Sequence, residues 1–362
     1  MKAACKVCEA WIVSRRSIGE AVASDESGPV EDTIPQKAKT NIQGFSTLQF
    51  DVIVDRDGSG NFTKISDAIS SAPNLSSRHY YIKIRAGVYV ENIFIEDHKT
   101  NIVLIGDGMD HTIITGNRSF DGGFKTYDTA TVGIRGNGFI ARDITFENAA
   151  GPNNMQAVAL MSESNSSAYY KCRFLGYQDT LYAKNGRQFY RECEIYGTVD
   201  FIFGNAAVVL QNSKIYARKP LLGQSNTITA QGRESRDNVG GTSIQNCTIK
   251  PAPGSDLRQV ETYLGRPWKK FSRTVILQSQ LDGIINPQGW SEWDGRASGL
   301  DTLYYGEYQN RGPGANTKDR VNWPGYKIIT SSTEAAKFTV REFIQGNTWI
   351  PSTGIPFLPD LI

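Results

Sequence analysis

The sequence predicts an all-β fold, a right-handed parallel β-helix with short flanking helices. The first observation is a three-residue motif that recurs between residues 138 and 282, with a polar residue in the middle and an apolar residue at the end. Successive copies start 20 to 34 residues apart, and self-similarity at such a period is typical of stacked repeats. The copies are Ile144-Thr145-Phe146, Cys172-Arg173-Phe174, Cys193-Glu194-Ile195, Ser213-Lys214-Ile215, Cys247-Thr248-Ile249 and Ser279-Gln280-Leu281.

The second observation concerns what lies between the copies. Each repeat contains short β-rich runs broken by Gly, Pro and Asn, and no helical stretch long enough to connect parallel strands in a βαβ unit. We therefore interpret each repeat as one coil of a β-helix. A β-propeller, which also repeats short strands, is the alternative.

The elements follow in order along the chain. Residues 1–50 are polar and aperiodic, and we predict a flexible leader there, before one β-helix domain over residues 51–362. DVIVDRDGSG predicts a strand and a turn, and the apolar residues of FTKISDAISSA share one face of a helix. A short helix should therefore cover one end of the stack, followed by short strands in YYIKIRAGVYVENIFI and NIVLIGDG.

The C-terminal part changes character. It contains two S/T-x-x-E capping boxes, Ser331 with Glu334 and Thr339 with Glu342. These predict two short helices packed outside the stack, with Gly346 ending the second one.

The composition excludes several classes of function. The chain has 39 Lys and Arg against 37 Asp and Glu, mixed along its length, so nothing indicates a nucleic-acid partner. No apolar run reaches the roughly 18 to 20 residues of a membrane span. Cys5 and Cys8 form a lone C-x-x-C without a second ligand pair, and all three histidines (His79, His98 and His111) lie upstream of the repeats. These residues indicate no metal site, and we expect a monomer.

One spacing is shared by two cysteines and two acids. Cys172 and Cys193 are 21 residues apart, and so are Asp179 and Asp200. Residues one period apart in a parallel stack lie above each other, separated by about 4.8 Å. That distance suits a disulfide, whose Cα atoms are about 4.4–6.8 Å apart, so we predict a Cys172–Cys193 bridge. It also places the two carboxyl groups close together.

Two carboxyl groups at this range cannot both ionise easily, so one keeps its proton while the other stays negative. That division provides a general acid and a nucleophile. The plainer reading is that Asp179 and Asp200 are turn residues that accept hydrogen bonds from backbone amides.

Neighbouring residues favour the reactive interpretation. Gln178 precedes one acid and Gln156 lies 22 residues further upstream, and their amides can donate hydrogen bonds to a developing oxyanion. Each could instead be a polar ladder residue. In YLGRPWKK, Arg266 supplies a cation for an aspartate and Trp268 a flat face for a sugar ring.

Four longer motifs complete the pattern. GPNNMQAVAL, GYQDTLY, GTVDFIFGNAAVV and YLGRPWK, in this order, resemble the signature set of plant pectin methylesterases, and the resemblance runs from Asp51 to Pro359. It implies a secreted cell-wall β-helix that hydrolyses methyl-esterified pectin to pectate and methanol without a metal or organic cofactor. It also implies a proteinaceous pectinesterase inhibitor as a partner. N-x-S/T triplets also favour secretion, and they begin at Asn61, Asn74, Asn117, Asn165 and Asn246.

The resemblance also implies residue roles. Asp200 matches the nucleophile and Asp179 the proton donor and acceptor. Gln156 and Gln178 match the groups that stabilise the tetrahedral intermediate. The residues that match the substrate site are Arg266, which also orients the nucleophile, Trp268, and Thr126 in GFKTYDTATV.

The chain departs from the family pattern at several positions. Ser213 stands where a cysteine is frequent and leaves Cys247 unpaired, Met161 stands where an arginine is usual, and the leader matches neither a signal peptide nor an inhibitor-like pro-region. Two other functions remain open: a pectin depolymerase on the same architecture, since close carboxyl pairs also serve retaining glycosidases, and an inactive pectin-binding relative.

Overall fold

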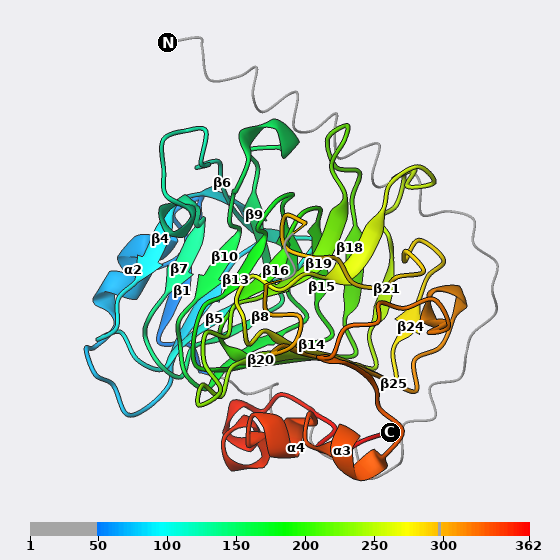
Figure 1. The fold of residues 1–362 in the computed structure, drawn as a ribbon. Helices are drawn as coiled ribbons and strands as arrows, with labels where there is room; N and C mark the ends of the chain where they lie inside the picture. Colours follow the sequence, from blue (N-terminus) through cyan, green and yellow to red (C-terminus); the bar gives the residue numbers. More distant parts are fainter. Residues whose placement is uncertain (1–48, 296–297) are drawn as a thin grey trace, which may run out of the picture.

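The computed structural model describes residues 49–295 and 298–362 and shows a parallel β-helix, as predicted. Its strands form three parallel sheets, and a typical coil contributes one strand to each of the three before the chain moves on to the next coil (Figure 1). Residues 1–48, which include Cys5, Cys8 and nearly all of the predicted leader, lie outside the described residues.

Sheet A is the largest, with eleven strands in the described part of the chain. Its order follows the sequence, so every neighbour is one coil away. The strands are β1 (Val52–Val54), β2 (Tyr80–Ile84), β5 (Ile102–Ile105), β8 (Ile140–Arg142), β11 (Ser167–Tyr170), β14 (Arg187–Arg191), β17 (Ala207–Gln211), β20 (Gly241–Gln245), β23 (Arg273–Leu277), β25 (Tyr304–Tyr308) and β26 (Tyr326–Ile328).

Sheet B contains the recurring motif. The middle residue of each copy is the first residue of a strand, and these residues are in register across the sheet. The strands are β3 (Gly87–Val90), β6 (Thr112–Gly116), β9 (Thr145–Asn148), β12 (Arg173–Leu175), β15 (Glu194–Gly197), β18 (Lys214–Ala217), β21 (Thr248–Pro251) and β24 (Gln280–Leu281). The repeats are therefore coils, and the propeller alternative is wrong.

Sheet C has short strands whose side chains alternate between the interior and the outer face. On β10, for example, Leu160 joins the main core while Met161 packs on the outside. The strands are β4 (Ile93–Ile95), β7 (Val132–Ile134), β10 (Leu160–Ser162), β13 (Leu181–Ala183), β16 (Ile202–Gly204), β19 (Asn226–Gln231) and β22 (Thr262–Gly265).

Stacked side chains fill the interior of the coil. Phe146 and Phe174, on neighbouring coils, stack with ring centroids 5.6 Å apart, and Tyr169 and Tyr190 do so at 4.5 Å. Both arrangements follow from the parallel register, which places equivalent side chains directly above one another.

The predicted short helices lie outside the coils. Helix α2 (Ile65–Ser71) buries the expected apolar face, including Ile65 and Ala68, at one end of the stack. Helices α3 (Ser332–Ala336) and α4 (Val340–Phe343) lie beneath sheet A in Figure 1, and Val340 packs there with apolar residues of the sheet.

One of the two capping boxes differs from the prediction. The Ser331 hydroxyl accepts a hydrogen bond from the Glu334 amide, as expected. The Thr339 hydroxyl instead donates to the carbonyl oxygen of Ala336 at 2.7 Å, so it does not cap α4. Gln345, with φ 52°, takes the left-handed position that was predicted for Gly346, because Gly346 begins a 3₁₀ turn.

Candidate active site

Asp179 and Asp200 occupy equivalent turns on adjacent coils, each two residues before a strand of sheet C. Leu181 of β13 is in register with Ile202 of β16, and the Asp179 amide donates to the Val199 carbonyl oxygen at 3.0 Å. Both acids have left-handed backbone angles, with φ 64° and 52°, and both are buried. The register therefore sets their Cα atoms about one inter-strand distance, about 4.8 Å, apart.

Arg266 holds the carboxylate of Asp200 in one orientation. Its Nε donates to Asp200 Oδ1 at 2.8 Å and a terminal nitrogen donates to Oδ2 at 2.7 Å. The Thr227 hydroxyl donates to Oδ1 at 2.6 Å and accepts from the Asp200 amide at 2.8 Å. A bidentate contact from a guanidinium group stabilises the charge of the carboxylate and sets the orientation of its plane.

The carboxyl group of Asp179 has a contrasting environment. Burial raises its pKa well above the usual value, the negative charge of Asp200 raises it further, and Arg266 opposes the rise. Among the described residues, no group hydrogen-bonds to this carboxyl. Asp179 is therefore suited to hold a proton beside the ionised Asp200.

Gln178 lies on the coil of Asp179, and Gln156 lies on the preceding coil. Gln178 immediately precedes Asp179, and the amide of Ala157, next to Gln156, donates to the Gln178 carbonyl oxygen at 3.2 Å. Gln156 Oε1 is buried without a hydrogen-bond partner in the described structure. A true amide ladder exists elsewhere, where Gln211 Nε2 donates to Gln245 Oε1 at 2.8 Å. Neither Gln156 nor Gln178 makes such a side-chain bond to a described residue.

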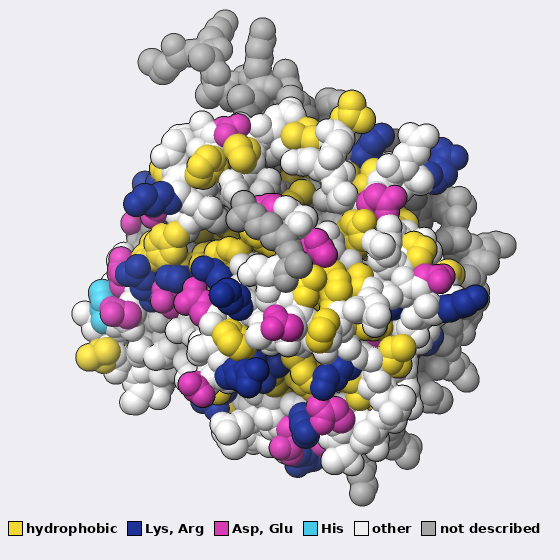
Figure 2. All heavy atoms as spheres, in the orientation of Figure 1, with side chains coloured by type: hydrophobic (Ala, Val, Ile, Leu, Met, Phe, Trp, Pro, Cys, Tyr) yellow, Lys and Arg dark blue, Asp and Glu magenta, His cyan; other side chains and the backbone are white. Residues whose placement is uncertain are grey.

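An aromatic platform covers the outer face of sheet C beside the acids. We use this name for Tyr127, Tyr182, Phe203, Trp268 and Trp293. Trp268 meets Phe203 edge to face, with ring centroids 6.1 Å apart, and the Arg266 guanidinium lies 4.3 Å from the Trp293 ring centroid. Figure 2 shows hydrophobic side chains gathered over these strands, bordered by charged side chains.

Thr126 begins a 3₁₀ turn, Thr126–Thr129, on the coil before Gln156. The Thr129 hydroxyl donates to the Thr126 carbonyl oxygen at 2.7 Å and accepts from the Val158 amide at 3.1 Å. The turn is therefore tied to the coil that holds Gln156. The Thr126 side chain is partly exposed.

Sequence reasoning missed three residues of the site. Thr227 lies 27 residues after Asp200, within the range of the coil period, so the same spacing argument could have found it. Trp293 and Asp294, whose carboxylate is 3.4 Å from Arg266, gave no periodic signal because their segment follows an irregular loop.

The predicted disulfide is wrong. Cys172 and Cys193 lie on adjacent coils, since Arg173 is in register with Glu194, but both thiols are free and buried, as is that of Cys247. The Cys193 thiol donates to the carbonyl oxygens of Tyr169 and Arg191, both at 3.4 Å.

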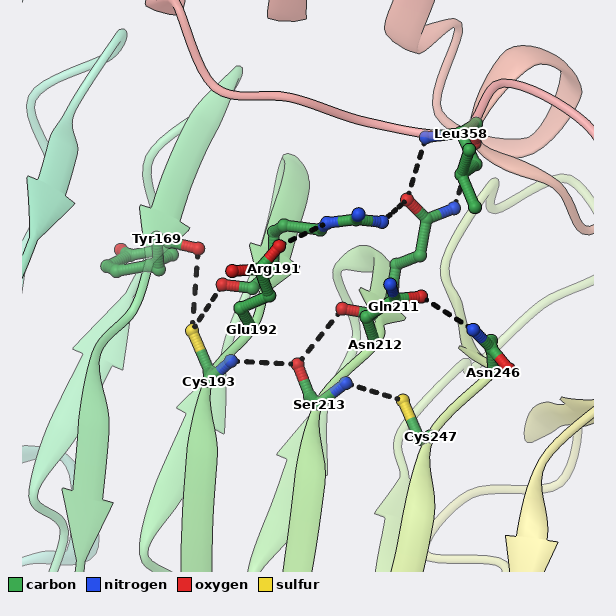
Figure 3. Close-up of polar contacts among 10 residues, drawn as sticks. All are labelled: Tyr169, Arg191, Glu192, Cys193, Gln211, Asn212, Ser213, Asn246, Cys247 and Leu358. Carbon is green, nitrogen blue, oxygen red and sulfur yellow. Dashed lines mark hydrogen bonds and ion pairs between the residues drawn. The ribbon is translucent and has the colours of Figure 1, made fainter. Parts of the chain in front are cut away.

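Hydrogen bonds continue along the same row of coils, as Figure 3 shows. The Cys193 amide donates to Ser213 Oγ at 3.1 Å, and the Ser213 amide donates to Cys247 Sγ at 3.4 Å. The backbone ladder holds the coils in register without a covalent bridge.

Two features are absent from the part of the chain that the structure describes. No group of three or more His, Cys, Asp and Glu side chains there is arranged to hold a metal ion. No helix in the same part of the chain combines the length and apolar character needed to cross a membrane.

The fold and the site define a parallel β-helix with a buried pair of acids beside an aromatic surface. A family model described as Pectinesterase matches residues 51–347, and the chain belongs to this family. It is 51% identical over 340 residues to the pectinesterase/pectinesterase inhibitor PPE8B of Prunus persica, covering 92% of this chain and 65% of that protein. The chain thus spans just under two thirds of this curated relative.

Two solved structures are similar as well. Pectin methylesterase from carrot is 50% identical with a TM-score of 0.85, covering 87% of this chain and 99% of that one. A pectin methylesterase in complex with a hexasaccharide is 25% identical with a TM-score of 0.69, covering 86% of this chain and 100% of that one.

Proposed function

We propose that this protein hydrolyses the methyl esters of homogalacturonan and releases methanol and pectate. The observation that carries the proposal is the pair of buried acids with opposite surroundings. Asp200 is ion-paired with Arg266, whereas burial and the charge of Asp200 raise the pKa of Asp179. Pectin methylesterase from carrot aligns with 87% of this chain, and its name supports pectin as the substrate.

In the first half of the proposed reaction, an Asp200 carboxylate oxygen attacks the ester carbonyl carbon. The negative charge that develops on the carbonyl oxygen is stabilised by the side-chain amides of Gln156 and Gln178. When the intermediate collapses, the carbon–methoxy bond breaks and the methoxy oxygen takes the proton of Asp179. Methanol leaves, and the acyl group remains on Asp200 as an anhydride.

The second half restores both acids. Asp179, now a carboxylate, accepts a proton from the attacking water. The water oxygen bonds to the acyl carbon, the anhydride bond breaks, and Asp200 returns to its ion pair with Arg266. The product leaves as galacturonic acid, which loses its remaining proton to solvent, and Asp179 again holds a proton.

The aromatic platform supports a polysaccharide substrate. Trp268 offers a partly exposed aromatic face next to Arg266, and Thr126 lies two coils before Asp179. The hexasaccharide complex of the solved relative fits a site that spans several coils.

We propose the cell wall as the location. Three N-x-S/T asparagines, Asn61, Asn74 and Asn117, are exposed, as a secreted glycoprotein requires. The name of the peach relative joins pectinesterase with pectinesterase inhibitor, which favours an inhibitor domain or protein as a partner.

The test is methanol release from highly methylated pectin by purified protein, compared with Asp200→Asn. Asn tolerates the left-handed backbone of Asp200, so this variant removes the nucleophile without straining the turn. We expect a loss of about 10⁴-fold or more. Asp143→Asn is the matched control, because Asp143 has the same left-handed geometry, with φ 59°, at a different corner of the coil.

The alternatives give different products. New reducing ends without methanol would indicate a depolymerase, and pectin binding without either product would indicate an inactive relative. Substantial methanol release by a folded Asp200→Asn variant would contradict the assignment of the nucleophile.

A further inference from the structure

Arg218 follows β18 directly and reaches back across two coils to the turn that precedes Asp179. One terminal nitrogen of its guanidinium donates to the Gly176 carbonyl oxygen at 3.0 Å, and the other donates to the Tyr177 hydroxyl at 2.7 Å. The guanidinium also lies 3.8 Å from the centroid of the Tyr177 ring. These partners are 42 and 41 residues away in the sequence.

The main chain of Arg218 contacts the coil between these two. Its amide donates to the Gly197 carbonyl oxygen at 2.8 Å, and Gly197 lies three residues before Asp200. One residue therefore joins three successive coils: the coil of Asp179, the coil of Asp200 and its own. Both of its backward contacts fall just before a reactive acid.

In the described part of the chain, Arg218 forms no ion pair with a carboxylate, and the charge of Glu147 acts on it only from beyond ion-pair distance. Among the described residues, its guanidinium bonds only to a carbonyl oxygen and a hydroxyl. Burial lowers its pKa, because the desolvation of a cation is unfavourable, and Tyr177 and the charge of Glu147 oppose this shift. An apolar side chain of similar length would avoid this cost. The feature that an apolar residue cannot supply is the planar two-nitrogen fork and its stacking on Tyr177.

The contacted turn is held in other ways as well. The Thr180 hydroxyl donates to the carbonyl oxygens of Tyr177 and Tyr196, at 3.2 and 2.9 Å, and the Thr198 amide donates to the Tyr177 carbonyl oxygen at 2.9 Å. These bonds fix the main chain after Gly176. Arg218 adds the contacts to the Gly176 carbonyl and the Tyr177 side chain.

We propose that Arg218 is a positioning residue of the esterase site: it holds the Gly176–Asp179 turn over the Asp200 turn. It thereby sets the separation of the two carboxyl groups and the placement of Gln178. It touches none of the proposed reacting atoms and acts through the turn alone. Small displacements of reacting groups are enough to reduce rates about 10²-fold. The inference rests on the proposed function for its kinetic readout.

The kinetic test compares Arg218→Met, which keeps the length of the side chain, with Arg218→Lys, which keeps the charge but loses the fork. We expect kcat for methanol release to fall about 10- to 100-fold in both variants, with KM within about threefold. Arg258→Met is the control, because Arg258 is an exposed arginine on a neighbouring loop, paired with Asp256, and should keep wild-type kinetics. Wild-type kcat in Arg218→Lys would overturn the proposal.

A second readout distinguishes positioning from general destabilisation. The charged groups that act on Asp179 are Asp200 and Arg266. If the turns drift apart in Arg218→Met, the charge of Asp200 acts less strongly, so the alkaline limb of the kcat profile should move to lower pH. An unmoved limb with a merely lowered melting temperature would show a structural role and contradict the proposal.

Two further measurements cover the remaining outcomes. If Arg218→Met does not fold, Tyr177→Phe, which removes the hydroxyl acceptor but keeps the ring, should give a smaller loss of kcat in the same direction; wild-type kcat there would count against the proposal. If the wild type releases no methanol, the proposed function fails. NMR titration of the Asp179 carboxyl in wild type and Arg218 variants then still tests the inference, and identical titration curves would overturn it.

Discussion

Replacing Arg266 by methionine should weaken both the fold and the reaction, because it leaves the Asp200 carboxylate buried without its cation. The pair has two hydrogen bonds, at 2.8 and 2.7 Å, and the side chains are 20% and 7% exposed for Arg266 and Asp200. Asp200 would keep only the bond from the Thr227 hydroxyl.

The magnitude follows from these contacts. Removing one partner of a buried ion pair costs about 3–5 kcal/mol of folding stability. The partial exposure of Arg266 and the remaining Thr227 bond favour the lower end, about 3 kcal/mol. An equal loss of orientation in the transition state corresponds to about 10²-fold in kcat/KM.

The pH dependence should change in a defined direction. Arg266 opposes the raised pKa of Asp179, so without this cation Asp179 keeps its proton to higher pH. The alkaline limb of methanol release should therefore move to higher pH in Arg266→Met. Arg266→Lys keeps the charge and should leave the limb near its wild-type position, with a rate loss of about tenfold from the missing fork.

The assay is methanol release between pH 5 and 10, together with urea unfolding of the same preparations. A folded Arg266→Met variant with the wild-type alkaline limb and a rate within about threefold of wild type would contradict the expected role of Arg266. It would mean that Asp200 reacts without the ion pair seen in the structure.

Three other predictions concern substitutions elsewhere in the site and in the core. Asp179→Asn should abolish methanol release yet raise the melting temperature above pH 7. Because the pKa of Asp179 is raised in the folded state, this group stabilises the fold fully below its unfolded pKa of about 4, and that stabilisation is lost as the pH rises through the folded pKa. Asn does not ionise and therefore avoids this loss. Equal melting curves at pH 8 would contradict this. Trp268→Ala should raise KM about tenfold with little change in kcat, and Trp268→Phe should restore most of the affinity; a pure kcat effect would argue against a binding role. Arg320→Met should cost about 3–5 kcal/mol in urea unfolding, because Arg320 and Glu307 form an ion pair whose side chains are both 2% exposed, and the double variant Arg320→Met/Glu307→Leu should recover part of this loss.

The spacing of similar motifs along the sequence predicts much of the fold. The motif copies in sheet B begin strands in register, as their recurrence predicted, because a parallel coil converts sequence period into vertical neighbours. The same rule predicts that Asp179 and Asp200 lie on adjacent coils, as the register of β13 with β16 confirms. The Ser331 cap was also readable, because it depends only on residues within one turn.

The sequence does not predict which partner a side chain bonds when several are within reach. The Thr339 hydroxyl takes the Ala336 carbonyl rather than capping α4, since the preceding helix offers an acceptor within reach. The Cys172 and Cys193 thiols stand one coil apart as the spacing required, yet both are free, because spacing fixes the height of a side chain and not its bonding partner.

The order of residues along the chain already specifies which residues stack, because a coil period is a local property of the chain. It therefore determined the β-helix and the closeness of the two acids. The three-dimensional packing was needed to show that Arg266, 66 residues beyond Asp200, binds that carboxylate. It was also needed to show that Arg218 returns over two coils to the turn of Asp179. Such contacts depend on how long side chains and loops fold across coils, and packing between distant segments sets their direction.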